Sequence, residues 1–510
     1  MIADIKALIV VLTLSGTIFV LAKPIALRFM SMEDFSRRRL VWFVLTTVGF
    51  VSPNFWLYAL VAVPMLVWAN RNDSNPIALY LLLLHVVPPV GVIIPVLGNN
   101  GLFSLDNYRL LAFCVLLPAT IRYRKHERAA AASVFGAMDI LLLAFGVLQV
   151  ALYVAPDLPH HFFIPDSPTN VLRRAVLYLL DTYLLYYAVS RICQSRKQLQ
   201  EAVACFCLAC AVMAALAMFE RTRNWLLFMD IMSRWGNPNG TFYLTRDGAV
   251  RAQVSAGHSI ALGYLLAIAF GFWLGLQSQI KRRMRRIGVT LLFWGGLFGA
   301  FSRGGWLGGA VVFFTFNAVG PRAISRVAKG ACIALAVGAL IAASPLGDEV
   351  LDLLPKAGQP ADEYRHRLAE RGWEVALANP FFGDQFPWPK MEDLRQGEGI
   401  IDIVNTYLGV TLNYGLVGLF LFLGFILLGT IRTYLRVREL TKSDPDFALF
   451  GASLIACIVG TLIMIDSSSF MLGCQKMFYV LAGLATAYAR LTDSPPQQPA
   501  AVGTRNTSQD

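Results

Sequence analysis

Runs of about 20 apolar residues recur along the whole of this chain, a pattern typical of membrane-spanning helices. They include residues 77–97, 199–218, 405–431 and 447–466. The chain is 56% hydrophobic, whereas a soluble domain is usually no more than about half apolar. We therefore expect an all-α polytopic membrane protein with about 13–15 transmembrane helices and without a large soluble domain.

Basic residues cluster between alternate pairs of these runs, at residues 37–39, 122–128, 191–197, 281–286, 321–329 and 432–442. Cytoplasmic loops are rich in Lys and Arg, so a single threading places all these clusters in the cytoplasm. The same rule explains the net charge of +12 without a nucleic-acid partner. We expect a multi-pass protein of the bacterial inner membrane, with residues 219–257, 302–305 and 345–404 facing the periplasm.

Three cysteines lie close together in the sequence CFCLAC, at Cys205, Cys207 and Cys210. They fall inside an apolar run and lack the spacing of a tetrahedral zinc site. Because free cysteine packs as a small hydrophobic residue, we expect neither a metal site nor a disulfide here.

Two arginines are unusual in this threading, because short periplasmic segments are normally poor in basic residues. Arg251 precedes an apolar run in RAQVSAGHSIALG, and Arg303 lies between two runs in FSRGGWLG. Each residue alone is compatible with a long side chain that reaches the membrane surface. Two of them at the mouths of spans on one side indicate a functional site.

The longest polar segment, residues 345–404, contains a predicted helix over 361–378. The helix begins near Pro360 and ends before Pro380, because the residue before a proline disfavours the helical conformation. Its apolar face is expected to consist of Tyr364, Leu368, Val375 and Leu377. We expect the segment to fold over the periplasmic mouth as a partly helical cap loop.

The chain re-enters the membrane with VNTYLGVTLNYGLVG, residues 404–418. Asn405 and Tyr407 offer hydrogen bonds to a polar ligand at the mouth, and Gly415 and Gly418 permit close contact between helices. A polar helix start followed by a packing glycine pair explains the stretch equally well when it is taken alone.

Together these features resemble the O-antigen ligase and polymerase superfamily, the Wzy/WaaL-like membrane proteins. The family signature is His, then Asn, Ser or Gln, nine residues, Gly, two residues and Gly. Here Asn405, Gly415 and Gly418 match it, and Val404 replaces the His. The arginine before a mid-chain span, the FSRGGWLGG turn and the loop with RHRLAERGWEVALANPFFGDQF also fit the family's layout. The resemblance covers roughly residues 240–440.

The resemblance implies a metal-independent glycosyltransferase with a GT-C-like fold and no cofactor. Its members take a saccharide from undecaprenyl pyrophosphate at the periplasmic face of the membrane. Polymerases pass it to the next lipid-linked repeat, and ligases pass it to the lipid A core. The missing His favours a polymerase of exopolysaccharide or O-antigen repeats. The expected partners are the glycan donor, the glycan acceptor and the lipid bilayer.

Such a transfer requires a cation beside the departing diphosphate, because negative charge builds there as the bond breaks. Arginine suits this role, since its planar guanidinium pairs with two phosphate oxygens at once. We assign the role to Arg251 and Arg303, with Arg365 or Arg367 of the cap loop as a candidate third cation.

A base is also expected to accept the proton of the acceptor hydroxyl, and Val404 has no group that can do so. The candidates are Asp402, His258, His366 and Glu398. Asp402 ranks first because it lies two residues before Val404. His258 follows Arg251 by seven residues, about two helical turns, which predicts a shared helix face. A solvated loop charge or a helix-capping histidine is the alternative for each candidate.

Two other classes of protein fit part of the pattern. A transporter or a lipid-linked oligosaccharide flippase would suit the number of spans, but it normally carries its charges near the bilayer centre. A non-catalytic scaffold would not need arginines at two span mouths. By region, we expect N-terminal transmembrane helices over 1–200, a ligase- or polymerase-type core over 201–491, and a disordered cytoplasmic tail over 492–510.

Overall fold

The computed structural model of the protein describes residues 2–94, 104–127, 136–154, 168–236, 245–246, 248–319, 325, 327–328, 330–331, 360–385, 387–396, 399–470 and 473–493. Glu398, residues 332–359 and the end of the predicted tail from residue 494 lie outside this described part.

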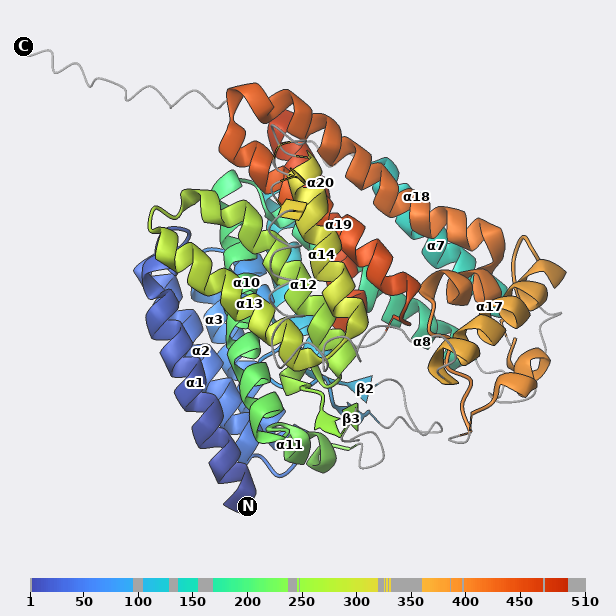
Figure 1. Cartoon of the computed structure of the whole chain (residues 1–510), viewed down its shortest axis with the longest axis horizontal. Helices are drawn as coiled ribbons and strands as arrows, with labels where there is room; N and C mark the ends of the chain where they lie inside the picture. Colours follow the sequence, from blue (N-terminus) through green and yellow to red (C-terminus); the bar gives the residue numbers. More distant parts are fainter. Residues whose placement is uncertain are drawn as a thin grey trace, which may run out of the picture.

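The described part consists almost entirely of helices, which confirms the predicted fold class (Figure 1). Its earlier helices are α1 (Ile2–Ala26), α2 (Met32–Val51), α3 (Phe55–Asn72), α4 (Pro76–Leu83), α5 (Asn107–Leu111), α6 (Leu117–Glu127), α7 (Ala137–Val154), α8 (Pro168–Tyr178) and α9 (Leu184–Ile192). Its later helices are α10 (Arg196–Arg223), α11 (Met229–Arg234), α12 (Ser259–Leu276), α13 (Arg283–Ala300), α14 (Arg303–Val319), α17 (Pro360–Ala378), α18 (Thr406–Ser443), α19 (Pro445–Asp466) and α20 (Gly473–Asp493).

Short elements connect or extend these helices. The π-helical turns are η1 (Ala112–Leu116) and η3 (Leu179–Tyr183), and the 3₁₀ turns are η4 (Val254–Ala256), η5 (Gln277–Gln279) and η6 (Trp388–Leu394). Two small antiparallel hairpins depart from a purely helical fold: β1 (Val92–Ile93) pairs with β2 (Ser104–Leu105), and β3 (Thr245–Arg246) pairs with β4 (Ala249–Val250).

Five of the described helices are long and apolar enough to cross a membrane. They are Asp4–Ala26, Arg196–Arg223, Ser259–Gln279, Thr406–Ser443 and Pro445–Asp466. This finding supports a multi-pass membrane protein. The total of about 13–15 spans stays a prediction, because other predicted spans fall in shorter helices or outside the described residues.

One predicted span, residues 77–97, is wrong. Helix α4 ends at Leu83, and the chain then runs through turns to the β1–β2 hairpin. A helix cannot continue through Pro88, whose ring excludes a helical hydrogen bond and disfavours helix in the residue before it. Gly91 then packs against β2, where a Cβ atom would lie 1.9 Å from the carbonyl oxygen of Leu105.

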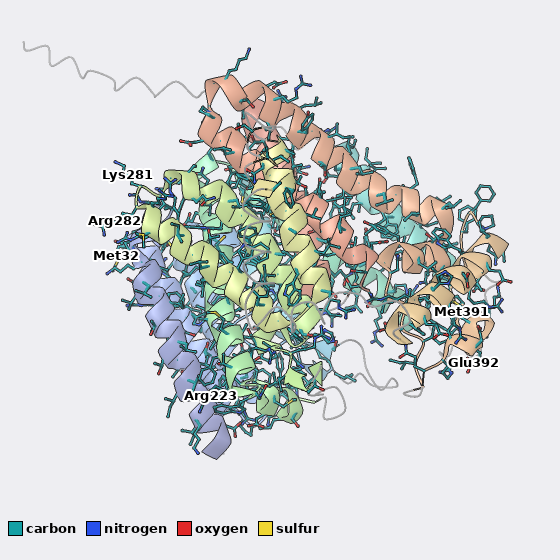
Figure 2. The ribbon with its side chains drawn as sticks, viewed as in Figure 1. Met32, Arg223, Lys281, Arg282, Met391 and Glu392 are labelled. Atoms are coloured by element: carbon teal, nitrogen blue, oxygen red, sulfur yellow. The ribbon has the colours of Figure 1, made fainter. Side chains whose placement is uncertain are left out.

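The two ends of the helix bundle are distinguished by their labelled residues in Figure 2. Met32, Lys281 and Arg282 lie together at one end, which we call the Lys281 end, and Arg223 lies toward the other, the Arg223 end. The segments predicted to be cytoplasmic and periplasmic thus begin at opposite ends of the bundle. Helices α10, α12 and α14 run between these ends beside one another (Figure 1).

A buried ion-pair network holds the Lys281 end together. Arg38, part of the basic cluster at residues 37–39 that is predicted to be cytoplasmic, is only 1% exposed. Its Nη2 lies 2.6 Å from Asp73 Oδ1, and its Nη1 lies 2.8 Å from Glu201 Oε1 of α10. A buried guanidinium is stable only when it is paired in this way. Arg38 therefore joins α2 to α10.

Close backbone contacts place α12 against its neighbours. A Cβ atom on Gly305 of α14 would lie 2.9 Å from the Cα of Gly263 in α12. Small residues permit this separation inside a helical membrane bundle. The thiols of Cys205, Cys207 and Cys210 in α10 are free and buried, as their apolar context predicts.

A candidate functional site at the Arg223 end

The polar start of α18 is bonded to the end of α19. The three bonds run from Asn405 Nδ2 to Asp466 Oδ1 (2.9 Å), from Thr406 Oγ1 to the Ser468 carbonyl (2.7 Å) and from Tyr407 Oη to the Leu462 carbonyl (2.6 Å). Asn405 Oδ1 also accepts the Leu408 N–H at 3.0 Å, so Asn405 caps the helix. These polar groups, predicted to face a ligand, thus fix the position of α19 relative to α18.

The start of α14 packs against the same end of α19. A Cβ atom on Gly304 would lie 3.3 Å from Ser467 Oγ, and one on Gly308 would lie 2.3 Å from Met464 Sδ. Arg303 is the first residue of α14, and Asp466 is the last residue of α19. Arg303 and Asp466 therefore lie next to the same contact between α14 and α19.

Arg251 reaches this end on a neighbouring segment. The Ala252 N–H donates to the Gly299 carbonyl oxygen at 3.1 Å, which places the segment beside the end of α13. Phe301 ends α13 in the left-handed conformation, at φ 50°, and the chain turns into α14. Arg251 and Arg303 are both half-buried, and the Nε atom of each is buried. The two predicted arginines therefore lie on adjacent segments at one end of the bundle.

Glu220, near the end of α10, holds the Arg251 segment in place. Its buried carboxylate accepts the N–H groups of Gln253 (2.9 Å), Val254 (3.0 Å) and Leu227 (2.9 Å). Val254 has a φ of 48°, which is unfavourable for a β-branched residue. We attribute the stability of this strained backbone to the carboxylate. Sequence reasoning missed Glu220, although an acid near the end of an apolar run was a visible signal.

His258 lies one residue outside α12 and caps it. Its Nδ1 accepts the Ile260 N–H at 3.2 Å. Burial and the positive charge of Arg251 lower the pKa of His258 to about 4. The predicted proximity to Arg251 is present, but the predicted reason is wrong, because residues 251–253 are irregular and Val254–Ala256 form a 3₁₀ turn, so no helix connects Arg251 to His258. Because Nδ1 accepts the Ile260 N–H, the neutral ring carries its hydrogen on Nε2 and has no free lone pair with which to accept a proton.

The first motif glycine, Gly415, breaks α18 and admits the cap loop. It has φ 64° and ψ −169°, and a Cβ atom there would lie 2.2 Å from the carbonyl carbon of Phe381. The Leu416 N–H, freed by the break, donates to the Pro380 carbonyl at 2.7 Å. The close approach predicted at Gly415 is therefore to loop backbone rather than to another helix.

The second motif glycine, Gly418, lies one turn beyond the break. A Cβ atom there would lie 2.3 Å from Tyr414 Cβ and 3.6 Å from Leu148 Cδ2 of α7. The second distance is an ordinary contact. The closer restriction comes from the kink itself, which brings Tyr414 over Gly418.

Helix α17 has nearly the predicted bounds and packs on the first half of α18. Its apolar cluster consists of Leu368, Val375, Ala376, Met391, Leu394, Leu408 and Leu412. Val404 packs against this cluster, so the position of the missing His faces the apolar core of the cap. The prediction for Leu377 is wrong, since it is 63% exposed and Ala376 is buried instead. Figure 1 shows α17 beside the start of α18 rather than across the ends of α12 and α14.

The candidate residues on α17 lie on the surface of the cap. Arg365, His366 and Arg367 are all exposed. His366 Nδ1 lies 3.4 Å from Glu370, and Arg367 Nη2 donates to the Asp393 carbonyl at 3.0 Å. The main-chain N–H and carbonyl of Asp402 both bond to Tyr364 Oη at 3.0 Å, which ties Asp402 to the cap.

Asp466 is a second residue that the sequence reasoning missed. It is exposed at the end of α19, beside the start of α14 and bonded to Asn405. The available signal was the sequence IDSSSF, which places a carboxylate after an apolar run on the same side as Arg251. Among the residues that the structure describes, no three His, Cys, Asp or Glu side chains are grouped to hold a metal ion.

The fold and this end of the bundle define a polytopic helical membrane protein with charged groups gathered at the ends of several long helices. Residues 288–423 match the family model described as O-antigen ligase. The match covers about a quarter of the chain and supports the predicted relationship to the O-antigen ligase and polymerase superfamily. No curated protein matches the chain. The family implies a ligase- or polymerase-type enzyme of glycan assembly that uses lipid-linked glycans in a membrane.

Proposed function

We propose that this protein is a membrane glycosyltransferase that polymerises undecaprenyl-pyrophosphate-linked oligosaccharide repeats at the periplasmic face of the bacterial inner membrane. The observation that carries the proposal is the placement of Arg251 and Arg303 on adjacent segments at the Arg223 end. The family match adds the substrate class, because its members act in glycan assembly.

The two guanidinium groups suit the leaving group of this reaction. When the sugar leaves undecaprenyl diphosphate, negative charge builds on the diphosphate oxygens. Guanidinium groups held in a fixed position stabilise that charge without reorganisation, and each can pair with two oxygens. Both Nε atoms are buried, so each guanidinium group is partly enclosed by protein. The electrostatic work is therefore done by arginine, and the proposed reaction uses no metal or cofactor.

The main alternative is an O-antigen ligase, which attaches the glycan to the lipid A core. We favour a polymerase because position 404, which carries His in the family signature, carries Val and packs against the apolar cluster of the cap. A flippase or transporter is less favoured, because Arg251 lies in the segment after β4 and Arg303 is the first residue of α14, so neither lies near the middle of a broken helix.

The test is complementation of a deletion strain with the wild type, Arg251→Ala, Arg303→Ala and the control Arg223→Ala. Arg223 is exposed and lies toward the same end. We expect the first two variants to abolish polymer while reaching the membrane, and to accumulate short lipid-linked repeats detectable by mass spectrometry. The control keeps normal chain lengths.

Other outcomes identify the alternatives. Unmodified lipid A core together with accumulated long lipid-linked chains in the deletion strain would indicate a ligase. Normal polymer from both arginine variants would contradict the diphosphate site. A deletion strain with unchanged surface glycans would contradict the proposed function as a whole.

A further inference from the structure

We infer that Asp466 is the catalytic base of the proposed transfer and that Asn405 is the residue that positions it. The inference rests on the proposed function. It starts from one contact, the hydrogen bond of 2.9 Å that Asn405 Nδ2 donates to Asp466 Oδ1. Asn405 follows directly after the position where the family signature carries its His.

One carboxylate oxygen of Asp466 is held by a hydrogen bond, and the other is accessible. Oδ1 accepts the amide of Asn405, whereas Oδ2 accepts no hydrogen bond from the residues that the structure describes. Asp466 also forms no ion pair within that part of the chain, and its side chain is exposed. A carboxylate oxygen with a fixed direction and free lone pairs can receive a proton from an incoming hydroxyl.

The position of Asp466 is unfavourable for helix stability. It is the last residue of α19, where the negative end of the helix dipole disfavours an anion and basic residues are preferred. Asp446, in the first turn of the same helix, lies instead at the positive end of the dipole, where an acidic residue is favourable. The presence of Asp466 at the end of α19 is therefore better explained by a chemical role than by a contribution to helix stability.

Asp466 is also placed beside the arginine assigned to the diphosphate. Ser467 and Gly304, which follow Asp466 and Arg303 in sequence, are in contact between α19 and α14. Asn405 brings α18 to the same point. A base and a cationic group on two packed helix ends can act on the two sides of one sugar diphosphate.

The other candidates are less suited to this role. Asp402 is tied through its main chain to Tyr364 of the cap. His258 uses Nδ1 as a helix cap, and His366 is paired with Glu370 on an exposed face of α17. Asp466 alone among these residues is joined directly to the motif asparagine.

The proposed transfer replaces one bond at the anomeric carbon of the donor sugar with another. The acceptor hydroxyl oxygen forms a bond to the anomeric carbon of the donor sugar, and the bond from that carbon to the diphosphate oxygen breaks. The electron pair of the broken bond leaves with undecaprenyl diphosphate, beside Arg251 and Arg303. The hydroxyl proton passes to Asp466 Oδ2 and from there to solvent.

The test uses the purified full chain and lipid-linked glycans extracted from the deletion strain, with release of undecaprenyl diphosphate as the readout. We expect Asp466→Asn to lower kcat by about 10²–10⁴-fold, with KM for the donor changed by less than about threefold. The matched control is Asp446→Asn, because Asp446 is exposed on the first turn of the same helix at the Lys281 end. It should turn over at the wild-type rate.

Two further variants separate a chemical role from a structural one. Formate should restore turnover to Asp466→Ala, because it supplies a carboxylate in the space left, but should not restore turnover to Arg303→Ala. Asn405→Asp keeps the side-chain oxygen that caps α18 but replaces the amide donor with a second carboxylate against Asp466, so kcat should fall although the cap is retained.

Three results would overturn the inference. They are a wild-type rate for Asp466→Asn, a loss in Asp466→Ala that formate leaves unchanged, and a larger loss of kcat in Asp402→Asn than in Asp466→Asn. Failure of the proposed function looks different, since the wild-type protein itself would then release no undecaprenyl diphosphate from any extracted glycan.

Discussion

Gly415 lies so close to Phe381 that a Cβ atom on the glycine would be 2.2 Å from the Phe381 carbonyl carbon. The loop after α17 therefore enters the break in α18, and its carbonyls at Pro380 and Phe381 accept the N–H groups of Leu416 (2.7 Å) and Val417 (3.2 Å). A helix break inside a membrane protein leaves polar backbone groups that need such partners. The motif glycine thus joins the cap to the first half of α18.

Substitution of Gly415 is expected to detach the cap. Gly415→Ala introduces both a clash with the loop and an unfavourable φ, at a cost of about 1–3 kcal/mol for the conformation alone. We expect a lower thermal unfolding temperature in detergent and loss of polymer formation. The matched control is Gly424→Ala in the same helix, where a Cβ atom would meet only Leu141 at 3.9 Å. Equal behaviour of the two variants would show that the break is not required.

The cap illustrates what the sequence could predict. Pro360 and Asn379-Pro380 mark the ends of α17, which spans Pro360–Ala378, because proline acts locally. The turn before Arg303 was also predictable from its position between two apolar runs. The break at Gly415 was not, because the stretch reads as one apolar span and only the loop that enters it makes the break favourable.

The contacts between helix ends were equally hidden. Nothing in the local sequence connects Asn405 with Asp466, which are separated by 61 positions. The same holds for Glu220, whose partners Gln253 and Val254 lie on another segment. Hydropathy predicts which residues lie near the membrane surface, whereas the choice of partner depends on how the helices pack.

Arg303→Lys is expected to be poorly active. A lysine keeps the charge but loses the planar pair of donors that fits two phosphate oxygens. We expect donor turnover to fall by about tenfold or more, and by about 10²–10³-fold in Arg303→Ala. Turnover of the extracted donor by the purified protein measures this, with Arg223→Lys as the control. Full activity of Arg303→Lys would show that this position requires only a positive charge and not the planar guanidinium group.

Glu220→Gln is expected to destabilise the Arg251 segment. The amide group replaces one of the two oxygens that accept the Gln253, Val254 and Leu227 N–H groups, so at least one buried donor loses its acceptor. Such a loss costs about 1–3 kcal/mol. Thermal unfolding and donor turnover should both decrease. Glu439→Gln, an exposed carboxylate on α18, is the control, and a silent Glu220→Gln would contradict the assigned role.

His258 is expected to make stability depend on pH. Its pKa is lowered to about 4 in the folded protein from an ordinary value of 6.5, so the unfolded chain binds a proton that the folded protein does not. The contribution is complete above the ordinary pKa and is lost as the pH falls toward 4. Between about pH 7.5 and about pH 5 the loss is about 2 kcal/mol.

The variant His258→Asn isolates this contribution, because asparagine retains the α12 cap without a titrating ring. Thermal unfolding should depend less on pH in the variant than in the wild type over this interval. An identical pH dependence in the two proteins would show that His258 does not titrate as its burial and Arg251 require.

The placement of the site on one side of the membrane can be tested with introduced cysteines. Arg223→Cys should react with a membrane-impermeant maleimide in intact spheroplasts, and Arg282→Cys only after permeabilisation, because the two residues lie toward opposite ends of the bundle. The native cysteines in the described part are all buried, so the unmodified chain serves as the background control. The Arg251 and Arg303 segments lie at the Arg223 end, where Asn224 Oδ1, one residue after Arg223, accepts the Val250 N–H at 3.3 Å. Labelling of both introduced cysteines from the same side would therefore contradict the assignment of these arginines to a periplasmic transfer site.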